Sequence, residues 1–274
     1  MKKLTVLLIL ALCFGAPVKA QEGIPVYFDY LADNYYLVYP SMAGIGEGGK
    51  IRLTARQQWF SVDQAPNLQT LNANFRVGER SGVGGILFND RNGFHSQTGM
   101  KLTYAHHLQL GGDFRTLNQI SLGLSAGIIL SSLDETEFRS VIPDPIITGV
   151  KNTTSYFNTD IGVSYNFLEF YAHAAVLNLL GTGRDLFTAA EFDNLRRYLI
   201  SAGYVFGKGS FRVEPSFLFQ LTEFTQERTI DINAKVYKDV GSNATIWGGL
   251  SYRRSFDGAQ FMPNGHLGDQ RLQL

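Results

Sequence analysis

Cysteine is almost absent from this chain of 274 residues, which contains only Cys13. Cys13 lies within the first twenty residues, where two lysines precede an apolar run, Leu4–Phe14, and Ala20 precedes a plausible cleavage site. This order of charge, apolar run and small residue predicts a secretory signal peptide over residues 1–20. With that segment removed no cysteine is left, which excludes disulfide bonds, zinc–thiolate sites and cysteine nucleophiles from the exported chain.

A lipoprotein is the alternative interpretation of Cys13. Acylation of the cysteine requires a small residue just before it, and Leu12 is not small. The sequence therefore favours a cleaved signal peptide.

The chain also lacks a charge excess and a second long apolar run. Its 24 Lys and Arg are balanced by 24 Asp and Glu, which does not suit a protein that binds by neutralising nucleic-acid phosphates. Hydrophobic residues make up 45% and aromatic residues 13%, too many for a disordered chain. No later window offers the ~18 consecutive apolar residues of a transmembrane helix. Two classes remain for an exported chain of this kind: a soluble all-β protein and an outer-membrane β-barrel.

Apolar and polar residues alternate with a period of two along much of the chain. In residues 70–77, for example, Leu71 and Phe75 fall on one face, and Asn72 and Asn74 on the other. The length of these segments, about eight to eleven residues, suits tilted membrane strands. Eleven strands are predicted, clearest at 70–77, 120–128, 157–167 and 211–221, and weaker at 50–60, 82–89, 97–110, 169–178, 197–206, 229–237 and 244–253.

The connections and the two faces of these segments favour the barrel. Short turns are predicted at 78–80, 89–93, 111–113 and 207–209, and longer polar stretches near 131–154, 179–196, 222–228 and 254–269. Short turns at one end and long loops at the other are typical of outer-membrane barrels. The polar face carries Gly, Ser and Asn, which suits a lumen. The apolar face carries aromatics near strand ends, as in interfacial girdles: Trp59, Tyr104, Phe157, Phe167, Tyr198, Phe206 and Phe211. The prediction is an all-β, antiparallel transmembrane outer-membrane β-barrel.

Patterns that could carry chemistry are better explained by the strands. Residues 123–127 match a nucleophile elbow around Ser125, but no helix follows this strand. Residues 44–49 have the glycine spacing of a dinucleotide site, but a strand follows where that site needs a helix. His106 and His107 are neighbours, so they point to opposite faces of a strand and cannot chelate one ion together. We expect no enzymatic activity, cofactor or metal.

Several strings resemble a known family. Pro40-Ser41-Met42-Ala43-Gly44 follows a Tyr-rich stretch, and Gln58-Trp59-Phe60-Ser61-Val62-Asp63-Gln64-Ala65-Pro66 precedes Gln69-Thr70-Leu71. Phe88-Asn89-Asp90 and Ser96-Gln97-Thr98-Gly99 come next. In order and spacing these strings resemble the PorP/SprF family, outer-membrane proteins of the type IX secretion and gliding machinery of Bacteroidota. The resemblance is most specific over residues 24–130.

The resemblance implies a non-enzymatic barrel in the outer membrane that helps secrete or anchor a large surface protein. The implied partners are a large adhesin, recognised through its C-terminal sorting domain, and periplasmic ring and motor components of the secretion system. Outer-membrane lipid is a further expected partner, and nucleic acid is not expected to be one. A passive porin or small-solute channel is the alternative function, because composition alone does not separate the two.

Two departures from the family pattern bear on the fold. The family usually has Asn-Pro-Ala where this chain has Tyr39-Pro40-Ser41. Family barrels also run on for further strands, whereas residues 270–274 resemble the beginning of a strand. We therefore expect about 12–14 strands in a complete barrel, with the last strands missing from this chain. The predicted organisation is a signal peptide (1–20), an N-terminal Tyr-rich segment and loop (21–49) and a barrel (50–274).

Two segments hold the candidate partner-binding residues. The Tyr-rich segment is expected to lie in the barrel or at its periplasmic mouth, because tyrosine is favoured at binding hot spots. The family motif is the second segment, and an alternative remains open there. In that alternative Trp59 is a girdle aromatic, and Asp63 and Pro66 shape the first turn. The candidates are Tyr27, Tyr30, Tyr35, Tyr39, Pro40 and Gly44 in the first segment, and Trp59, Asp63 and Pro66 in the second.

Overall fold

A computed structural model gives the fold of part of the chain. It describes residues 34–46, 48–59, 61–62, 64–111, 117–136, 149–180, 196–207, 209–223, 226–241 and 244–256, and the backbone of 270–273. The predicted signal peptide and the candidates Tyr27, Tyr30 and Asp63 lie outside these residues.

The described part of the chain is an antiparallel sheet with two short 3₁₀ helices before it, η1 (Tyr35–Leu37) and η2 (Pro40–Met42). The sheet has twelve strands in sequence order, so every strand pairs with its neighbours along the chain. Neither helix is long and apolar enough to cross a membrane. The strands are β1 (Gly49–Gln57), β2 (Asn67–Arg76), β3 (Ser81–Asn92), β4 (His95–Gln109), β5 (Asn118–Asp134), β6 (Lys151–Phe167), β7 (Phe170–Leu177), β8 (Arg197–Tyr204), β9 (Phe211–Thr222), β10 (Arg228–Val240), β11 (Ala244–Ser255) and β12 (Gln270–Gln273).

The eleven strands predicted from alternation are all present, so the all-β antiparallel fold is confirmed. Several strands are longer than predicted, and β5 and β6 extend farthest beyond their predicted bounds. β5 and β6 have 17 residues each, and they stay paired as far as Asp134 opposite Lys151. The polar stretch predicted at 131–154 is therefore partly strand. Its Ser and Thr side chains continue the ladder, and Ser132 Oγ lies 3.0 Å from Thr153 Oγ1 across it.

The turn predicted at 89–93 is also shorter than expected. β3 continues to Asn92 and β4 starts at His95, so only Gly93 and Phe94 connect them. Gly93 has a φ of 62°, which glycine adopts without steric cost. The polar residues before it pair with β4 instead of forming a loop.

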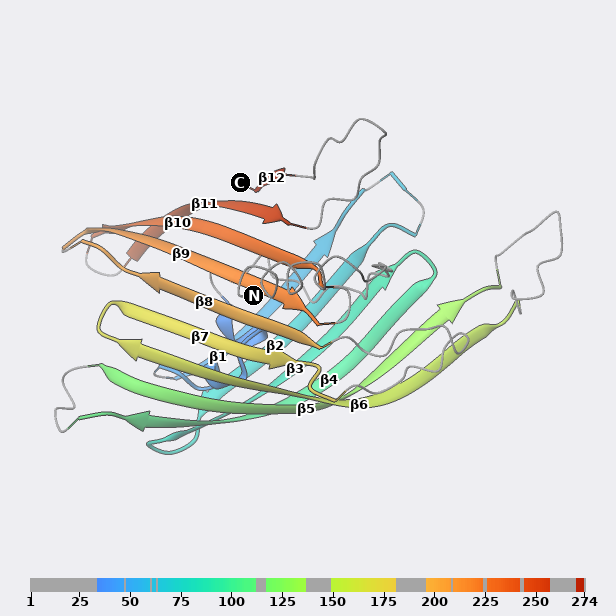
Figure 1. Ribbon diagram of the computed structural model, residues 1–274, viewed down its shortest axis with the longest axis horizontal. Coiled ribbons are helices and arrows are strands. Elements are labelled where there is room, and N and C mark those ends of the chain that lie inside the picture. The colour runs from blue at the N-terminus through green and yellow to red at the C-terminus, as the bar shows by residue number, and fades with distance from the viewer. Residues whose placement is uncertain are drawn as a thin grey trace, which may run out of the picture.

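The sheet curls on itself, as a barrel wall does. Figure 1 shows β1–β4 lying behind β8–β11, with η1 and η2 between the two sides. β1 and β12 are the two ends of the strand order, and no register joins them in the described residues. One end of the sheet, called here the long-loop end, carries the long connections 58–66, 135–150, 178–196 and 256–269 and the shorter ones 93–94 and 223–227. The opposite end, the short-turn end, carries the connections 77–80, 110–117, 168–169, 205–210 and 241–243.

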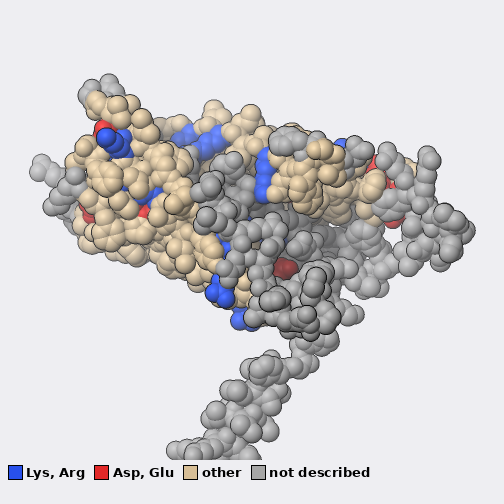
Figure 2. Space-filling view, turned by 90° about the horizontal axis from the view of Figure 1, so that it is seen from above, with Lys and Arg blue, Asp and Glu red and all other residues tan. Residues whose placement is uncertain are grey.

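Side-chain burial is inverted relative to a soluble protein. Leu71 is 42% exposed and Phe75 is 49% exposed on the convex face of β2, whereas Asn72 and Asn74 on its concave face are buried. The same holds in β5, where Leu122 and Leu124 are exposed and Ser121 and Ser125 are buried. Most of the described residues on the face drawn in Figure 2 are uncharged, and Lys and Arg form small separate groups among them. Apolar-out, polar-in alternation is that of a membrane barrel.

The strand register defines the edge of this outer apolar surface, called here the apolar belt. One row of outward residues is apolar on all six strands β1–β6: Leu53, Leu71, Leu87, Met100, Ile128 and Phe157. The next outward row towards the long-loop end is mostly polar: Ala55, Gln69, Asn89, Thr98, Leu130 and Ser155. The belt therefore ends between these two rows over half of the sheet.

Depth in the belt should decide the cost of a charge on the outer face. Replacing Leu124→Arg, near the middle of β5, should lower the free energy of unfolding by about 2–4 kcal/mol. Leu130→Arg is the matched control at the belt edge of the same strand and should cost at most about 1 kcal/mol. Urea titration of the refolded protein in lipid vesicles measures both. Equal costs at the two positions would contradict the assignment of the belt.

Candidate functional site

Residues 34–44, called here the lumen segment, lie on the concave face of the sheet. Tyr39, Ser41 and Ala43 are each 0% exposed. η2 contacts β4, β5 and β6, and Tyr39 belongs to a buried cluster with side chains of β7, β8 and β9: Ala175, Leu177, Leu199 and Leu218. Of the predicted Tyr-rich segment, the described part thus lies inside the barrel wall, where it occupies the space between facing strands.

Glycines on the inner face make room for this segment. A Cβ at Gly82 would collide with the carbonyl group of Ala43, and one at Gly123 would collide with the peptide bond between Pro40 and Ser41. The backbone of the segment therefore packs directly against the backbone of β3 and β5. This close approach accounts for glycine at inward positions where a barrel wall by itself would accept serine or asparagine.

Polar groups of the wall hold the segment at its Gly44 end. Asn74 Oδ1 accepts a hydrogen bond from the backbone N–H of Gly44 at 3.1 Å. His107 Nε2 lies 3.0 Å from the carbonyl oxygen of Ala43, and since a carbonyl only accepts, Nε2 carries the proton. The Ser41 and Ser164 hydroxyl oxygens are 2.6 Å apart. These contacts satisfy buried backbone and side-chain groups that would otherwise each cost about 1–3 kcal/mol.

Tyr36 adds a hydrogen bond farther along the segment. Its hydroxyl donates to Thr103 Oγ1 at 2.9 Å, and Thr103 Oγ1 lies 2.7 Å from Ser125 Oγ. Burial raises the pKa of Tyr36 to about 12. The hydroxyl is therefore protonated and able to donate at neutral pH.

A network around Glu214 anchors the other end of the segment. The Tyr35 hydroxyl lies 2.9 Å from that of Tyr171, which donates to Glu214 Oε1 at 2.6 Å. Tyr237 donates to the other carboxylate oxygen at 2.6 Å. Lys235 Nζ is 3.4 Å from Glu214 and 5.8 Å from the centre of the Tyr35 ring. Burying this ion pair is tolerable because the carboxylate and the ammonium share hydrogen-bonding partners.

The lumen also contains a serine–histidine pair. His107 Nδ1 is 2.8 Å from Ser121 Oγ, and both residues are buried. The other ring nitrogen of His107 is occupied by the Ala43 carbonyl, so the imidazole holds the lumen segment in place. Ser125, the serine of the elbow-like motif, is buried on the inner face in the middle of β5, within a continuous strand. No group of three or more metal-ligating side chains occurs in the described residues.

The motif residues lie at the opposite end of β1 from Gly44. Trp59 follows the end of β1, is 65% exposed and has a φ of 52°. The Trp59 carbonyl oxygen accepts a hydrogen bond from the backbone N–H of Val62 at 2.9 Å. The Pro66 carbonyl oxygen accepts one from the backbone N–H of Gln58 at 3.0 Å. The structure therefore does not bring the two predicted segments together. One fills the lumen, and the other forms the first loop at the long-loop end.

Comparison with protein families identifies the family to which this chain belongs. A family model described as "Type IX secretion system membrane protein PorP/SprF" matches residues 19–272. The chain belongs to the PorP/SprF family. No curated protein matches it. The family resemblance of the motifs is thus confirmed over residues 19–272 of this chain. The exposed apolar belt is consistent with the membrane location in the family's description.

The sequence did not indicate the partners of the lumen segment. Glu214, Lys235 and Tyr171 come from strands β7–β10, and the Tyr35 hydroxyl meets that of Tyr171 across 136 positions. Alternation placed Glu214 on the inner face. In the register, Glu214 lies opposite Lys235, and both occupy inward positions. This placement of an acid opposite a lysine is the one signal that could have identified the pair.

Filling the space reserved by Gly123 should expel the lumen segment. Gly123→Val in a chain that carries Ser41→Cys and lacks Cys13 should raise maleimide labelling of position 41 severalfold, because the new side chain overlaps the Pro40–Ser41 backbone. Gly248→Val is the matched control, since a Cβ at Gly248 meets nothing within 4 Å. Heat-modifiable migration on gels verifies folding of both variants. Unchanged labelling of folded Gly123→Val protein would contradict the packing described.

Proposed function

We propose that this PorP/SprF protein is a non-enzymatic outer-membrane barrel that helps secrete or anchor a large cell-surface protein. Two findings support the proposal: the family match over residues 19–272 and the apolar belt on the convex face. The protein reaches the outer membrane by its predicted signal peptide. Its client is an adhesin-like protein recognised through a C-terminal sorting domain.

The occupied lumen is the observation that carries this proposal over a passive porin. A porin needs an open polar passage. Here Tyr39, Ser41 and Ala43 are fully buried between facing strands, and the Glu214 network ties Tyr35 to the wall. When a barrel's own N-terminal segment occupies its lumen, its two ends remain available for binding another protein.

Partner contacts are assigned to the two ends of the barrel. The long-loop end faces the cell exterior, since outer-membrane barrels have long extracellular loops and short periplasmic turns. Trp59 is exposed there and serves as a contact for the surface client. The short-turn end faces the periplasmic ring and motor components. Tyr35 and Tyr39 reach a partner only when the lumen segment leaves the barrel, because both are packed inside the wall.

Recovery of partners from native outer membranes tests the proposal. Detergent pull-down of the tagged full chain, read by mass spectrometry, should recover a large surface protein together with periplasmic secretion components. Trp59→Ala should reduce recovery of the surface protein about tenfold or more, as loss of a hot-spot tryptophan does. Phe206→Ala, an exposed aromatic at the opposite end, is the control and should leave the recovery of the surface protein unchanged.

The opposite result has a distinct signature. Recovery of the barrel alone, with ion conductance of the purified protein in a planar bilayer, would contradict the proposal and support the porin.

A further inference from the structure

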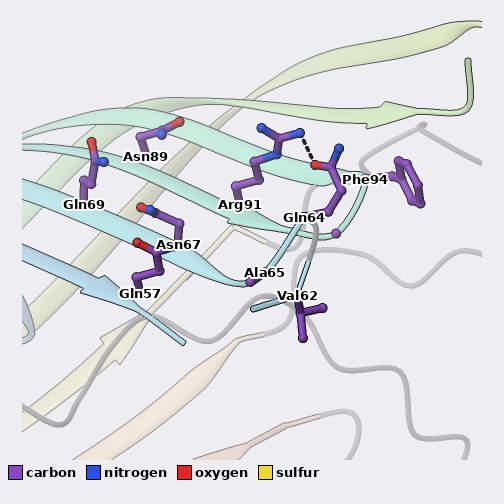
Figure 3. Close-up of a pocket in the computed structure, with 10 residues that line it drawn as sticks. Gln57, Val62, Gln64, Ala65, Asn67, Gln69, Asn89, Arg91 and Phe94 are labelled. Atoms are coloured by element: carbon purple, nitrogen blue, oxygen red, sulfur yellow. Dashed lines mark hydrogen bonds between the residues drawn. The ribbon is translucent and has the colours of Figure 1, made fainter. Parts of the chain in front are cut away.

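A polar cleft of about 870 Å³ lies at the long-loop end of β1–β3. Figure 3 shows amide side chains from three neighbouring strands along it, with Arg91 reaching the first loop. A second hollow of about 300 Å³ shares Asn89 and Arg91 and extends to Asp134 and Lys151. The polar side chains that line the larger cleft are Gln57, Gln64, Asn67, Gln69, Asn89 and Arg91.

The first loop forms one wall of the cleft and is tied to the β3–β4 turn. The carbonyl of Gln64 accepts from the backbone N–H of Gly93 at 2.9 Å. The Arg91 guanidinium donates to the side-chain oxygen of the same glutamine. The cleft is thus a built feature of the fold, and part of the family motif, Gln64 and Ala65, lines it.

The strand register places the cleft on the lipid-facing side of the sheet. Gln69 and Asn89 lie in the first outward row beyond the belt, and Gln57 and Arg91 lie in the outward row two residues farther along. The last apolar row, which includes Leu71 and Leu87, lies directly beneath. Any molecule whose apolar part lies on the belt at this point brings its polar end to the cleft.

The chemistry of the lining matches a phosphorylated sugar. Carboxamides both donate and accept hydrogen bonds, as sugar hydroxyls require. Arg91 presents the planar fork that suits phosphate, and Lys151 adds a second positive charge in the adjoining hollow. Among the described residues that line the two hollows, Asp134 is the one carboxylate. A zwitterionic phospholipid headgroup also carries a phosphate, but it lacks the hydroxyl groups of a sugar and would leave most of the amides without partners.

We infer that this cleft binds the phosphorylated sugar headgroup of a glycolipid in the outer leaflet, with the acyl chains on the apolar belt below. This site is separate from the lumen and requires no protein client. Its test therefore succeeds or fails independently of the proposed function. A bound glycolipid would hold the first loop, and with it Trp59, at the membrane surface.

Lipid titration of the purified full chain tests the inference. Native mass spectrometry in detergent should show one saturable lipid A molecule, a bis-phosphorylated diglucosamine glycolipid, on the wild-type protein. Arg91→Gln should weaken this binding on the order of tenfold, as loss of one charged hydrogen-bonding partner does, and Arg91→Lys should weaken it less. Lys238→Gln removes an exposed outward cation near the short-turn end of β10 and should change nothing.

Three outcomes would overturn the inference. Equal lipid A binding by Arg91→Gln and wild type would place the lipid elsewhere. Equal loss in Lys238→Gln would show a general charge effect. Full displacement of lipid A by inorganic phosphate or by glucosamine 1-phosphate at matched concentration would show that the belt contributes nothing and that the site is for a free phosphate. Heat-modifiable migration on gels verifies that each variant is folded.

Discussion

Backbone hydrogen bonding is the constraint on which this structure depends. In lipid each unpaired peptide group costs several kcal/mol, so strands that cross a membrane must bond to one another along their full length. In the described residues, each strand meets this requirement by pairing with its neighbours along the chain, in one antiparallel sheet in sequence order. The pleat then sends alternate side chains to opposite faces, which fixes an apolar exterior and a polar interior in the same residues.

The polar interior in turn encloses a space that either protein or water must occupy. Here the chain fills it with its own residues 34–44, and the wall is adapted to them. Gly82 and Gly123 admit the backbone of the segment, His107 binds the Ala43 carbonyl, and Glu214 accepts hydrogen bonds around Tyr35. Paired charges such as Lys101–Asp160, 2.5 Å apart, are retained in the wall because each charge has its counterion. A lumen occupied in this way supports a binding or anchoring function over free passage of solutes.

Local patterns in the sequence predicted the wall and a Tyr-rich segment in the barrel or at its mouth, but not the contacts between the two. Alternation over 120–128 predicted β5 and the face on which each of its residues lies, because alternate side chains of a strand face lipid and lumen and differ in polarity accordingly. The ends of β5 and β6 escaped prediction, since Ser and Thr beyond the belt resemble a loop in the sequence. The Glu214–Tyr35 network also escaped prediction, because its members lie 179 positions apart and are brought together only by the curl of the sheet. The motif strings identified the PorP/SprF family, but they did not indicate which wall residues contact Pro40 and Gly44.

A disulfide between the lumen segment and the wall tests the central claim most directly. Ser41 and Ser164 have hydroxyl oxygens 2.6 Å apart, so cysteines at both positions, in a chain without Cys13, are close enough to form one. Oxidation of the double variant in native outer membranes should protect both thiols from maleimide and restore them on reduction, whereas each single variant should give no intramolecular link. Two free thiols in correctly folded barrels after oxidation would contradict a lumen filled by this segment.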